Sequence, residues 1–507
     1  MTHALLIYNA RLLDEATDSP GALLAVNGKI RALFHGYFTN FSTVERLAKA
    51  VMAEDGCKDD YGIEAFDARR LTVTPAFIDM HVHLRDPGQT HKEDLNSGLH
   101  AAVAGGYGTV VAMPNTAPVV SSAEAALEVN RRAEELRLAR VIQSVSITSG
   151  FGGIDISHLD KLDAGQVPLI TEDGHEVASA AIMLAAMKKA AQRGIIVSCH
   201  CEDPELAAAA RTYRVSALAK MLRFGLSASG ADEKSALRSV PKAMLEEIDV
   251  GLEKANRLLA LAENTATERN IALAREAGCA IHIAHISTAR AIEAVRNAKL
   301  DVLEEQGYLL EDAESDAYDD AFDAQSHADF SEQAEDGAFR ITCEATPHHI
   351  ALCGDEEPFI RAIVNPPLRP ESDRFALLEA IRDGLVDVIS TDHAPHTPPE
   401  KSAGSPGFTG LETAYAVCNT VLVRGGHIDA RRLSQLMSAN PARLLGLNKG
   451  ILKSGCDADI AVVDPDEEWT VDPSLFCSKG RATPFEGRTL VGKVRNVFLA
   501  GLNIFEA

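Results

Sequence analysis

The sequence predicts an α/β protein built on a closed (β/α)8 TIM barrel, with a small β-sandwich-like domain formed from both termini. Eight short apolar runs recur along the chain, and alanine-rich helical segments such as 178–191 and 266–277 separate several of them. Strand alternating with helix is typical of a parallel sheet, and eight such units favour a barrel. Polar residues directly follow the runs, at the end of a barrel where active sites lie.

Each apolar run has the length of a buried strand. The predicted barrel strands are residues 71–80, 108–113, 141–147, 167–170, 195–199, 279–284, 339–343 and 386–390. Outside them, four stretches have the pattern of short strands joined by turns: 4–13, 23–33, 458–463 and 494–499. We therefore predict that residues 1–70 and 448–507 join in the small β-domain and that 71–447 form the barrel.

Two stretches interrupt the barrel pattern. Residues 301–338 hold 14 acidic residues and no lysine or arginine. Like charge at this density resists packing, so we expect a solvated loop. Residues 204–250 are also long for a barrel loop, and they mix charge with glycine and serine. We therefore treat both stretches as insertions into the barrel domain.

The bulk composition restricts the partners of the chain. Its 507 residues carry a formal net charge of −24, and the pI is about 5.1. Such an acidic surface argues against nucleic acid and anionic membranes, but not against a small anionic substrate held in a locally positive site. No apolar run has the length of a membrane span, and the N-terminus lacks the pattern of a signal peptide. The nine cysteines are scattered without CxxC pairs, which favours reduced thiols in the cytoplasm.

Histidine and aspartate residues gather at the predicted strand ends. His81 and His83 end the first run, and alternation along a strand directs both imidazoles to the same side. Four further candidates each follow a separate run: Asp173, His200, His285 and Asp392. Imidazole nitrogens combined with carboxylates suit zinc. We predict that two divalent ions share this set, with one carboxylate between them.

Seven ordered words of the sequence resemble the signatures of the dihydroorotases of the bacterial class I type, within the amidohydrolase superfamily. They begin at Asp79 (DMHVHLRDPG), Ala112 (AMPNT), Glu172 (EDG), His200 (HCED), Ala284 (AHIS), Val364 (VNPPLR) and Thr391 (TDHAPH). The resemblance extends from about residue 70 to about residue 450, interrupted by the two insertions. It implies a zinc-binding barrel enzyme.

The resemblance also implies a role for each candidate ligand. His81 and His83 would bind the first zinc ion, whereas His200 and His285 would bind the second. Asp392 would ligate the first zinc ion and act as the catalytic proton shuttle.

The bridging ligand implied by the resemblance is Asp173, which would join the two zinc ions together with a hydroxide. Other amidohydrolases place a carboxylated lysine at the corresponding position. Here no lysine lies between Lys161 and Lys188, and the word at this strand end is Glu172-Asp173-Gly174. We therefore expect an aspartate bridge.

Substrate contacts are expected beside the metal ligands. Arg85 lies two residues past His83, and a planar guanidinium at that position can hold a carboxylate in a fork. The resemblance implies further substrate contacts from His83, Asn115, Asn365, His396 and the backbone at Pro406-Gly407.

The function implied by the resemblance is that of a dihydroorotase. Such an enzyme reversibly hydrolyses the cyclic amide of (S)-dihydroorotate to N-carbamoyl-L-aspartate in pyrimidine (UMP) biosynthesis. Two alternatives stay open: another cyclic-amide hydrolase of the hydantoinase or allantoinase type, and an inactive dihydroorotase-like subunit that stabilises aspartate carbamoyltransferase. Arg85 and the aspartate bridge count against the first, and the six intact ligands count against the second. We expect a small-molecule substrate, and we keep self-association and association with aspartate carbamoyltransferase as open predictions.

Overall fold

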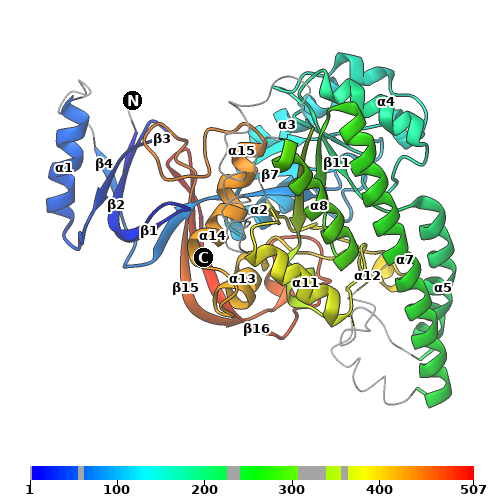
Figure 1. The fold of residues 1–507 in the computed structure, drawn as a ribbon. Helices are drawn as coiled ribbons and strands as arrows, with labels where there is room; N and C mark the ends of the chain where they lie inside the picture. Colours follow the sequence, from blue (N-terminus) through cyan, green and yellow to red (C-terminus); the bar gives the residue numbers. More distant parts are fainter. Residues whose placement is uncertain (1–2, 55–61, 225–239, 306–338, 355–362) are drawn as a thin grey trace.

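The chain folds into an α/β barrel beside a mixed β-sheet that contains both termini, as Figure 1 shows. The computed structural model describes residues 3–54, 62–224, 240–305, 339–354 and 363–507. The predicted fold class is therefore confirmed, and each of the eight predicted runs overlaps a barrel strand. The domain boundaries at residues 71 and 447 stay a prediction.

The barrel wall consists of short parallel strands that are almost wholly buried. They are β6 (Phe77–Val82), β7 (Tyr107–Ala112), β8 (Arg140–Gln143) continued by β9 (Val145–Ser146), β10 (Leu169–Thr171), β11 (Ile196–Cys199), β12 (Ala280–Ile283), β13 (Arg340–Ala345) and β14 (Val388–Ile389). Their order is β6-β7-β8 in one sheet and β9-β10-β11-β12-β13-β14 in the other. Strands covered on both faces have to be apolar throughout, which is why each one appeared as a continuous apolar run.

The first and last barrel strands meet and close the wall. Val82 and His393 form a parallel bridge, and the backbone N–H of His83 donates to the carbonyl oxygen of His393 at 2.8 Å. Below them, the Asp79 carboxylate accepts a hydrogen bond from the backbone N–H of Thr391 at 3.1 Å. Closure brings the end of β6 next to the residues that follow β14.

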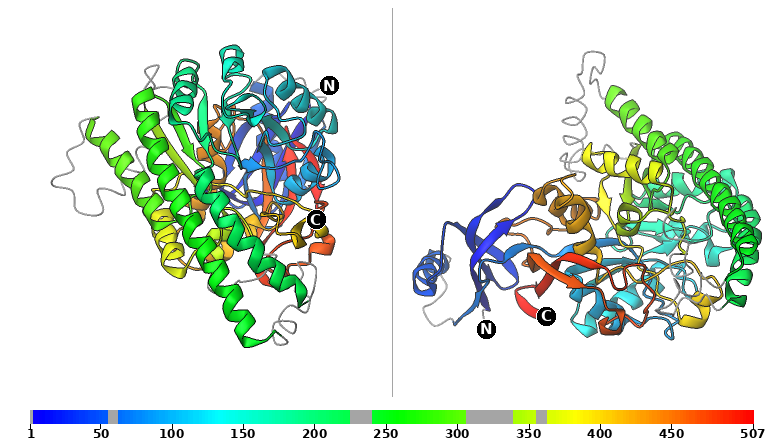
Figure 2. Two further views of the ribbon diagram at one scale, coloured as in Figure 1. Left: turned by 90° about the vertical axis from the view of Figure 1, so that its right-hand side faces the viewer. Right: turned by 90° about the horizontal axis from the view of Figure 1, so that it is seen from below.

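Helices surround the barrel on its outer side (Figures 1 and 2). They are α2 (Leu95–Ala104), α3 (Ala123–Leu136), α4 (Ala180–Ala191), α5 (Pro204–Arg223), α7 (Lys242–Ala277), α8 (Ala289–Glu305), α10 (Pro347–Ala351), α11 (Glu371–Arg382), α12 (Pro398–Ser402), α13 (Ala414–Cys418), α14 (Ala430–Ser434) and α15 (Asn440–Leu444). Most of them share one large core cluster with the strands, to which α2, α3, α4, α7, α8, α10, α11, α13 and α14 contribute.

The mixed sheet joins the two ends of the chain. Its elements are β1 (Ala4–Leu13), β2 (Asp18–Val26), β3 (Lys29–His35), β4 (Ile63–Asp67), β5 (Thr72–Pro75), β15 (Ile460–Thr470), β16 (Thr489–Leu499) and β17 (Leu502–Glu506), with helix α1 (Phe41–Glu54) packed on β1. The first predicted run is thus divided, because β5 pairs with β1 and β15 in this sheet while β6 belongs to the barrel.

The insertion at 204–250 is helical in its described part, whereas our sequence analysis treated it as a loop. Helices α5 and α7 pack side by side and extend beyond the barrel (Figure 2). Alanine and leucine are frequent in α5, and their helix propensity explains the difference. Of the acidic insertion, residues 301–305 end α8, and 306–338 lie outside the described residues. Among the described helices, none is long and apolar enough to cross a membrane.

Candidate metal centre

The predicted metal ligands all lie at the same end of the barrel, where the strands terminate. Each one ends a strand or follows it within a few residues, and all six are buried: His81 and His83 (β6), Asp173 (β10), His200 (β11), His285 (β12) and Asp392 (β14). Parallel strands place their carboxyl ends at one rim, so residues from distant parts of the chain meet here.

The first group of ligand atoms surrounds His81, His83 and Asp173. The Nε2 atom of His81 lies 3.3 Å from Asp173 Oδ1, and the Nε2 atom of His83 lies 3.5 Å from Asp173 Oδ2. Asp392 joins this group, because its Oδ1 atom lies 3.1 Å from His83 Nε2. These separations suit atoms that share one central cation.

The second group contains Asp173, His200 and His285. His200 Nδ1 lies 2.9 Å from His285 Nε2 and 3.3 Å from Asp173 Oδ1. Asp173 therefore belongs to both groups, as a bridging carboxylate must. This buried set of histidines and a shared aspartate fits a binuclear metal site.

The surroundings of His81 favour a cation. His81 Nδ1 donates to Glu344 Oε1 at 2.8 Å, while His81 Nε2 is buried without a hydrogen-bond partner among the described residues. Its lone pair would face the Asp173 carboxylate unless a cation lay between them. Burial lowers the pKa of His81, but the charges of Asp173 and Glu344 outweigh burial and raise it well above its ordinary value. The surroundings of His81 therefore favour a positive charge at this position, and the donor set of histidines and carboxylates fits zinc.

In the second group, burial and nearby carboxylates also have opposite effects on the pKa of a histidine. Burial acts to lower the pKa of His200, but its contacts with Asp173 and Glu202 raise that pKa to about 10. By contrast, burial and the nearby charges of His200 and His81 lower the pKa of His285 to about 4. His285 thus stays neutral, which is the form that binds a metal ion.

Glu344 is a functional residue that the sequence analysis missed. Its carboxylate accepts hydrogen bonds from His81 Nδ1 and, at 3.2 Å, from the backbone N–H of His285. It also lies 3.2 Å from His282 Nε2. A carboxylate that holds the outer nitrogen of a metal-binding histidine fixes the tautomer and the orientation of the ring. The available signal was its position, since Glu344 ends β13 as the ligands end their own strands.

Arg85 lies close to the predicted metal ligands. The residue is only 7% exposed, and its Nη2 and Nε atoms lie 3.3 Å from His396 Nε2 and from the carbonyl oxygen of Pro395. It forms no ion pair with any described residue. Burial lowers the pKa of Arg85, yet a guanidinium stays charged at neutral pH. Within the described part of the chain, its charge is opposed only by carboxylates beyond ion-pair distance, among them Asp392 and Asp173.

The remaining predicted substrate positions differ in their surroundings. Asn115 contacts two ligands, because its Oδ1 accepts from His83 Nδ1 at 2.9 Å and its Nδ2 donates to Asp173 Oδ2 at 3.0 Å. His396 Nε2 lies 2.9 Å from the carbonyl oxygen of Pro406. Burial and the charge of Arg85 lower the pKa of His396 to about 3, so its imidazole is neutral.

The backbone near Arg85 and the ligands is unusual. Arg85, His285 and Asp392 adopt φ angles of +58°, +33° and +48°, which are uncommon for residues other than glycine. Gly407 has a φ of +115°, and a Cβ there would lie 2.6 Å from Ala394 Cβ. Glycine is therefore required where the 406–407 backbone closes on this side of the site.

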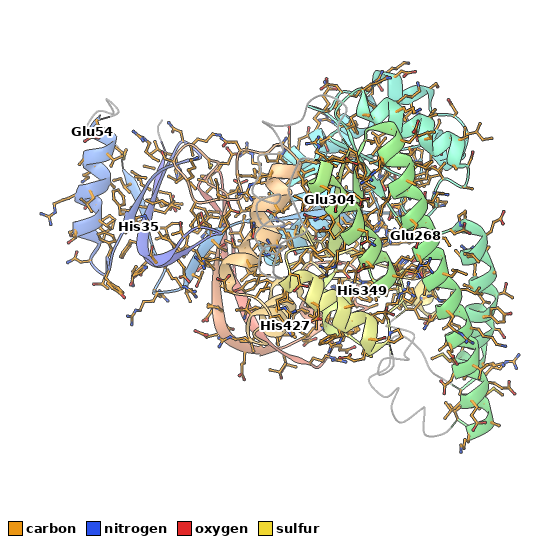
Figure 3. All side chains as sticks on the ribbon, in the orientation of Figure 1. His35, Glu54, Glu268, Glu304, His349 and His427 are labelled. Atoms are coloured by element: carbon orange, nitrogen blue, oxygen red, sulfur yellow. The ribbon has the colours of Figure 1, made fainter. Side chains whose placement is uncertain are left out.

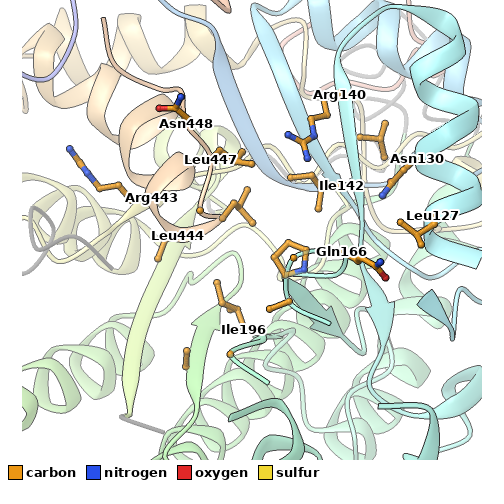
Figure 4. A pocket seen from close by; sticks show the side chains of 18 of the residues that line it. Leu127, Asn130, Arg140, Ile142, Gln166, Ile196, Arg443, Leu444, Leu447 and Asn448 are labelled. Atoms are coloured by element: carbon orange, nitrogen blue, oxygen red, sulfur yellow. The ribbon is translucent and has the colours of Figure 1, made fainter. Parts of the chain in front are cut away.

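A second cavity, of about 820 Å³, lies at the opposite end of the barrel (Figure 4). Its walls include Arg140, Ile142 and Ile196, which lie at or near the starts of β8 and β11. None of the six predicted ligands lines it. This cavity is therefore separate from the predicted metal ligands, and the convergence of ligand atoms locates the site.

The chain belongs to the amidohydrolase family, because residues 72–503 match the model of that family. Within the family it is dihydroorotase-like, which confirms the resemblance seen in its sequence words. It is 35% identical to the dihydroorotase of Clostridium botulinum over 498 residues, which cover 98% of each chain. It is 32% identical to the dihydroorotase of Aquifex aeolicus over 498 residues, covering 97% of this chain and 96% of that one.

Solved structures share the fold. L-hydantoinase (dihydropyrimidinase) from Arthrobacter aurescens superposes with a TM-score of 0.74 at 21% identity, covering 100% of this chain and 96% of that one. Dihydropyrimidinase from Brevibacillus agri gives a TM-score of 0.70 at 18% identity, covering 100% and 95%. At this level of identity the likeness establishes the barrel architecture and its attached sheet alone.

Proposed function

We propose that this protein is a dihydroorotase that reversibly hydrolyses the ring amide of dihydroorotate to N-carbamoyl-L-aspartate. The proposal rests on the dihydroorotase relatives named above, on the binuclear donor set, and above all on one observation. Arg85 is a buried cation without an ion pair in the described part of the chain, and it lies on the same short segment as His81 and His83.

Arg85 supports this substrate because of the charge that the substrate carries. Every cyclic-amide substrate brings the same reacting amide, so the metal ligands cannot distinguish one ring from another. Dihydroorotate also carries a carboxylate outside that amide, and hydantoin carries none. A buried guanidinium held at a fixed position can bind such a carboxylate in a fork. The hydrogen bond from Arg85 Nε to the carbonyl oxygen of Pro395 holds the guanidinium in place.

Asp392 is the proposed general base. Burial acts to raise its pKa, but the hydrogen bond from His83 and the charge of His81 outweigh burial and lower it. Asp392 is therefore a carboxylate at neutral pH, able to accept a proton from the attacking water and to donate it to the departing ring nitrogen. Two zinc ions held by the six ligands would supply a water of lowered pKa and polarise the amide carbonyl.

Turnover on a set of cyclic amides tests the proposal. We expect kcat/KM for dihydroorotate to exceed kcat/KM for hydantoin and allantoin, and two zinc ions to be counted per chain. A higher kcat/KM for hydantoin or allantoin would identify that compound as the substrate in place of dihydroorotate. Zinc-loaded protein without turnover on any of them would favour a non-catalytic subunit. Self-association and association with aspartate carbamoyltransferase stay predictions, which mass measurement of the purified protein can check.

A further inference from the structure

Arg214, on the inserted helix α5, is a second guanidinium near the metal centre. Its Nη1 atom donates to Asn365 Oδ1 at 2.7 Å. Among the described residues it has no carboxylate partner at ion-pair distance. Arg369 shows the contrast, since its guanidinium forms an ion pair with Glu263 at 2.7 Å. Burial lowers the pKa of Arg214 to about 10, so it stays charged at neutral pH.

The helix holds Arg214 against the loops that carry predicted substrate contacts. Ala217, Leu218 and Met221 form the buried face of α5, and Arg214 precedes Ala217 and Leu218 by three and four residues, which places it on the same face. Leu218 shares an apolar cluster with Ile363, two residues before Asn365. A Cβ on Gly404 would collide with Leu218, so α5 also packs closely on the loop that leads to Gly407.

Two neighbouring groups, Glu202 and His349, lie between the Arg214–Asn365 pair and the metal ligands. Arg214 lies within electrostatic range of Glu202, whose Oε2 is 3.7 Å from His200 Nε2. On the other side, the carbonyl oxygen of Pro366 lies 3.1 Å from the Nε2 atom of His349, which is labelled in Figure 3. The charge of Asp392 acts on His349 in turn.

The chemistry of the two side chains fixes what Asn365 can offer. A guanidinium has donors and no acceptor, so the atom that faces it must be the amide oxygen. The contact turns the oxygen of Asn365 toward Arg214, and Nδ2, on the other branch of the amide, has no partner among the described residues. On the side away from Arg214, Asn365 therefore presents its NH2 group, which is a donor.

We infer that Arg214 is a positioning residue that makes Asn365 an obligate hydrogen-bond donor to the substrate. The substrate atom met at this point is then an acceptor, a carbonyl or carboxylate oxygen, and not a ring N–H. The inference rests on the proposed function for the identity of the substrate. It assigns to the insertion 204–250 a part in substrate recognition.

Replacing Asn365 by aspartate separates a donor role from a structural one. The new carboxylate keeps the partnership with Arg214 and adds charge to it, but it has no proton to donate. We expect Asn365→Asp to keep or raise Tm while kcat/KM for dihydroorotate and the affinity for orotate, measured by calorimetry, both fall at least about tenfold. Parent-like kcat/KM and orotate binding in Asn365→Asp would overturn the inference.

A double-mutant cycle tests the positioning role of Arg214. Arg214→Met should raise KM about three- to tenfold, and Arg214→Met in the Asn365→Ala background should add less than about twofold, because both changes remove the same contact. Arg211→Met is the matched control, since Arg211 is exposed on the same helix; it should leave KM unchanged. If the two changes raise KM independently, so that their factors multiply in the double variant, the inference is overturned. If the parent hydrolyses another cyclic amide instead, the proposed function fails, and the same variants assayed on that amide still decide the role of Arg214.

Discussion

Replacing Arg85 by methionine removes one charge from the site and little else. Methionine keeps an apolar stem in the buried position, and the strained backbone at φ +58° is equally strained for both residues. The lost interaction is a charge-assisted hydrogen-bonded contact with the substrate carboxylate, worth about 1.5–3 kcal/mol. Since about 1.4 kcal/mol is tenfold in rate, kcat/KM for dihydroorotate should fall about 10- to 150-fold.

The assay compares kcat/KM in both directions of the reaction, together with the zinc content of each variant. Both directions should fall by the same factor, because the overall equilibrium constant is unchanged, and zinc content should stay at the parent value because Arg85 touches no ligand atom. Arg85→Lys should recover only part of the loss, since an ammonium cannot form a fork. Arg131→Met is the control, because Arg131 is exposed on α3 and pairs with Glu128 and Glu135.

His396 provides a second readout of the same change. The charge of Arg85 contributes to the low pKa of His396, so removing that charge should raise the pKa, as followed by NMR of the imidazole. If Arg85→Met hydrolyses dihydroorotate as well as the parent does, the carboxylate is held elsewhere and the substrate assignment is refuted.

Three further changes test other parts of the structure. Asp392→Asn should lower kcat by about 10²–10⁴-fold with Tm preserved; a variant within about twofold of the parent would place the general base elsewhere. The pKa values of His81 and His200 are raised in the metal-free protein, so zinc should displace protons from these rings and its affinity should rise with pH. Calorimetry in buffers of different ionisation enthalpy should detect the released protons. Zinc binding without proton release would contradict the pKa shifts. Lys299→Met leaves Asp387 buried without its partner at 2.8 Å, which should destabilise the fold by about 3–5 kcal/mol; an unchanged Tm would show that this pair contributes little.

The barrel strands were predictable because burial on both faces imposes an uninterrupted apolar pattern. The same reason explains the one strand that was misread. Residues 71–80 are apolar on both sides of Ala76, yet β5 pairs in the terminal sheet and β6 in the barrel. An apolar pattern indicates that a strand is buried, but it does not indicate which sheet the strand joins. The division of residues 71–80 between β5 and β6 therefore depends on which strands pair with each part.

The six candidate ligands were predictable for a similar reason, since strand ends in a barrel converge on one rim. Glu344 obeyed the same rule, but its role depends on a contact with His81, 263 residues away. Arg214 could not be found from the pattern of the barrel. It lies in an insertion that we treated as a loop, and its role appears only once α5 is placed against the 363–365 segment.

Pairing of the first barrel strand with the residues after the last one determines when the metal centre can form during synthesis and folding. His83 and Asp392, which meet at 3.1 Å, are separated by 309 residues. A ribosome must therefore complete more than three quarters of the 507-residue chain before these two side chains can approach each other. Earlier strands can form their neighbouring pairs during synthesis, but the reacting centre exists only after the ring is joined. The recovery of catalytic activity during refolding therefore reports when the first and last barrel strands pair.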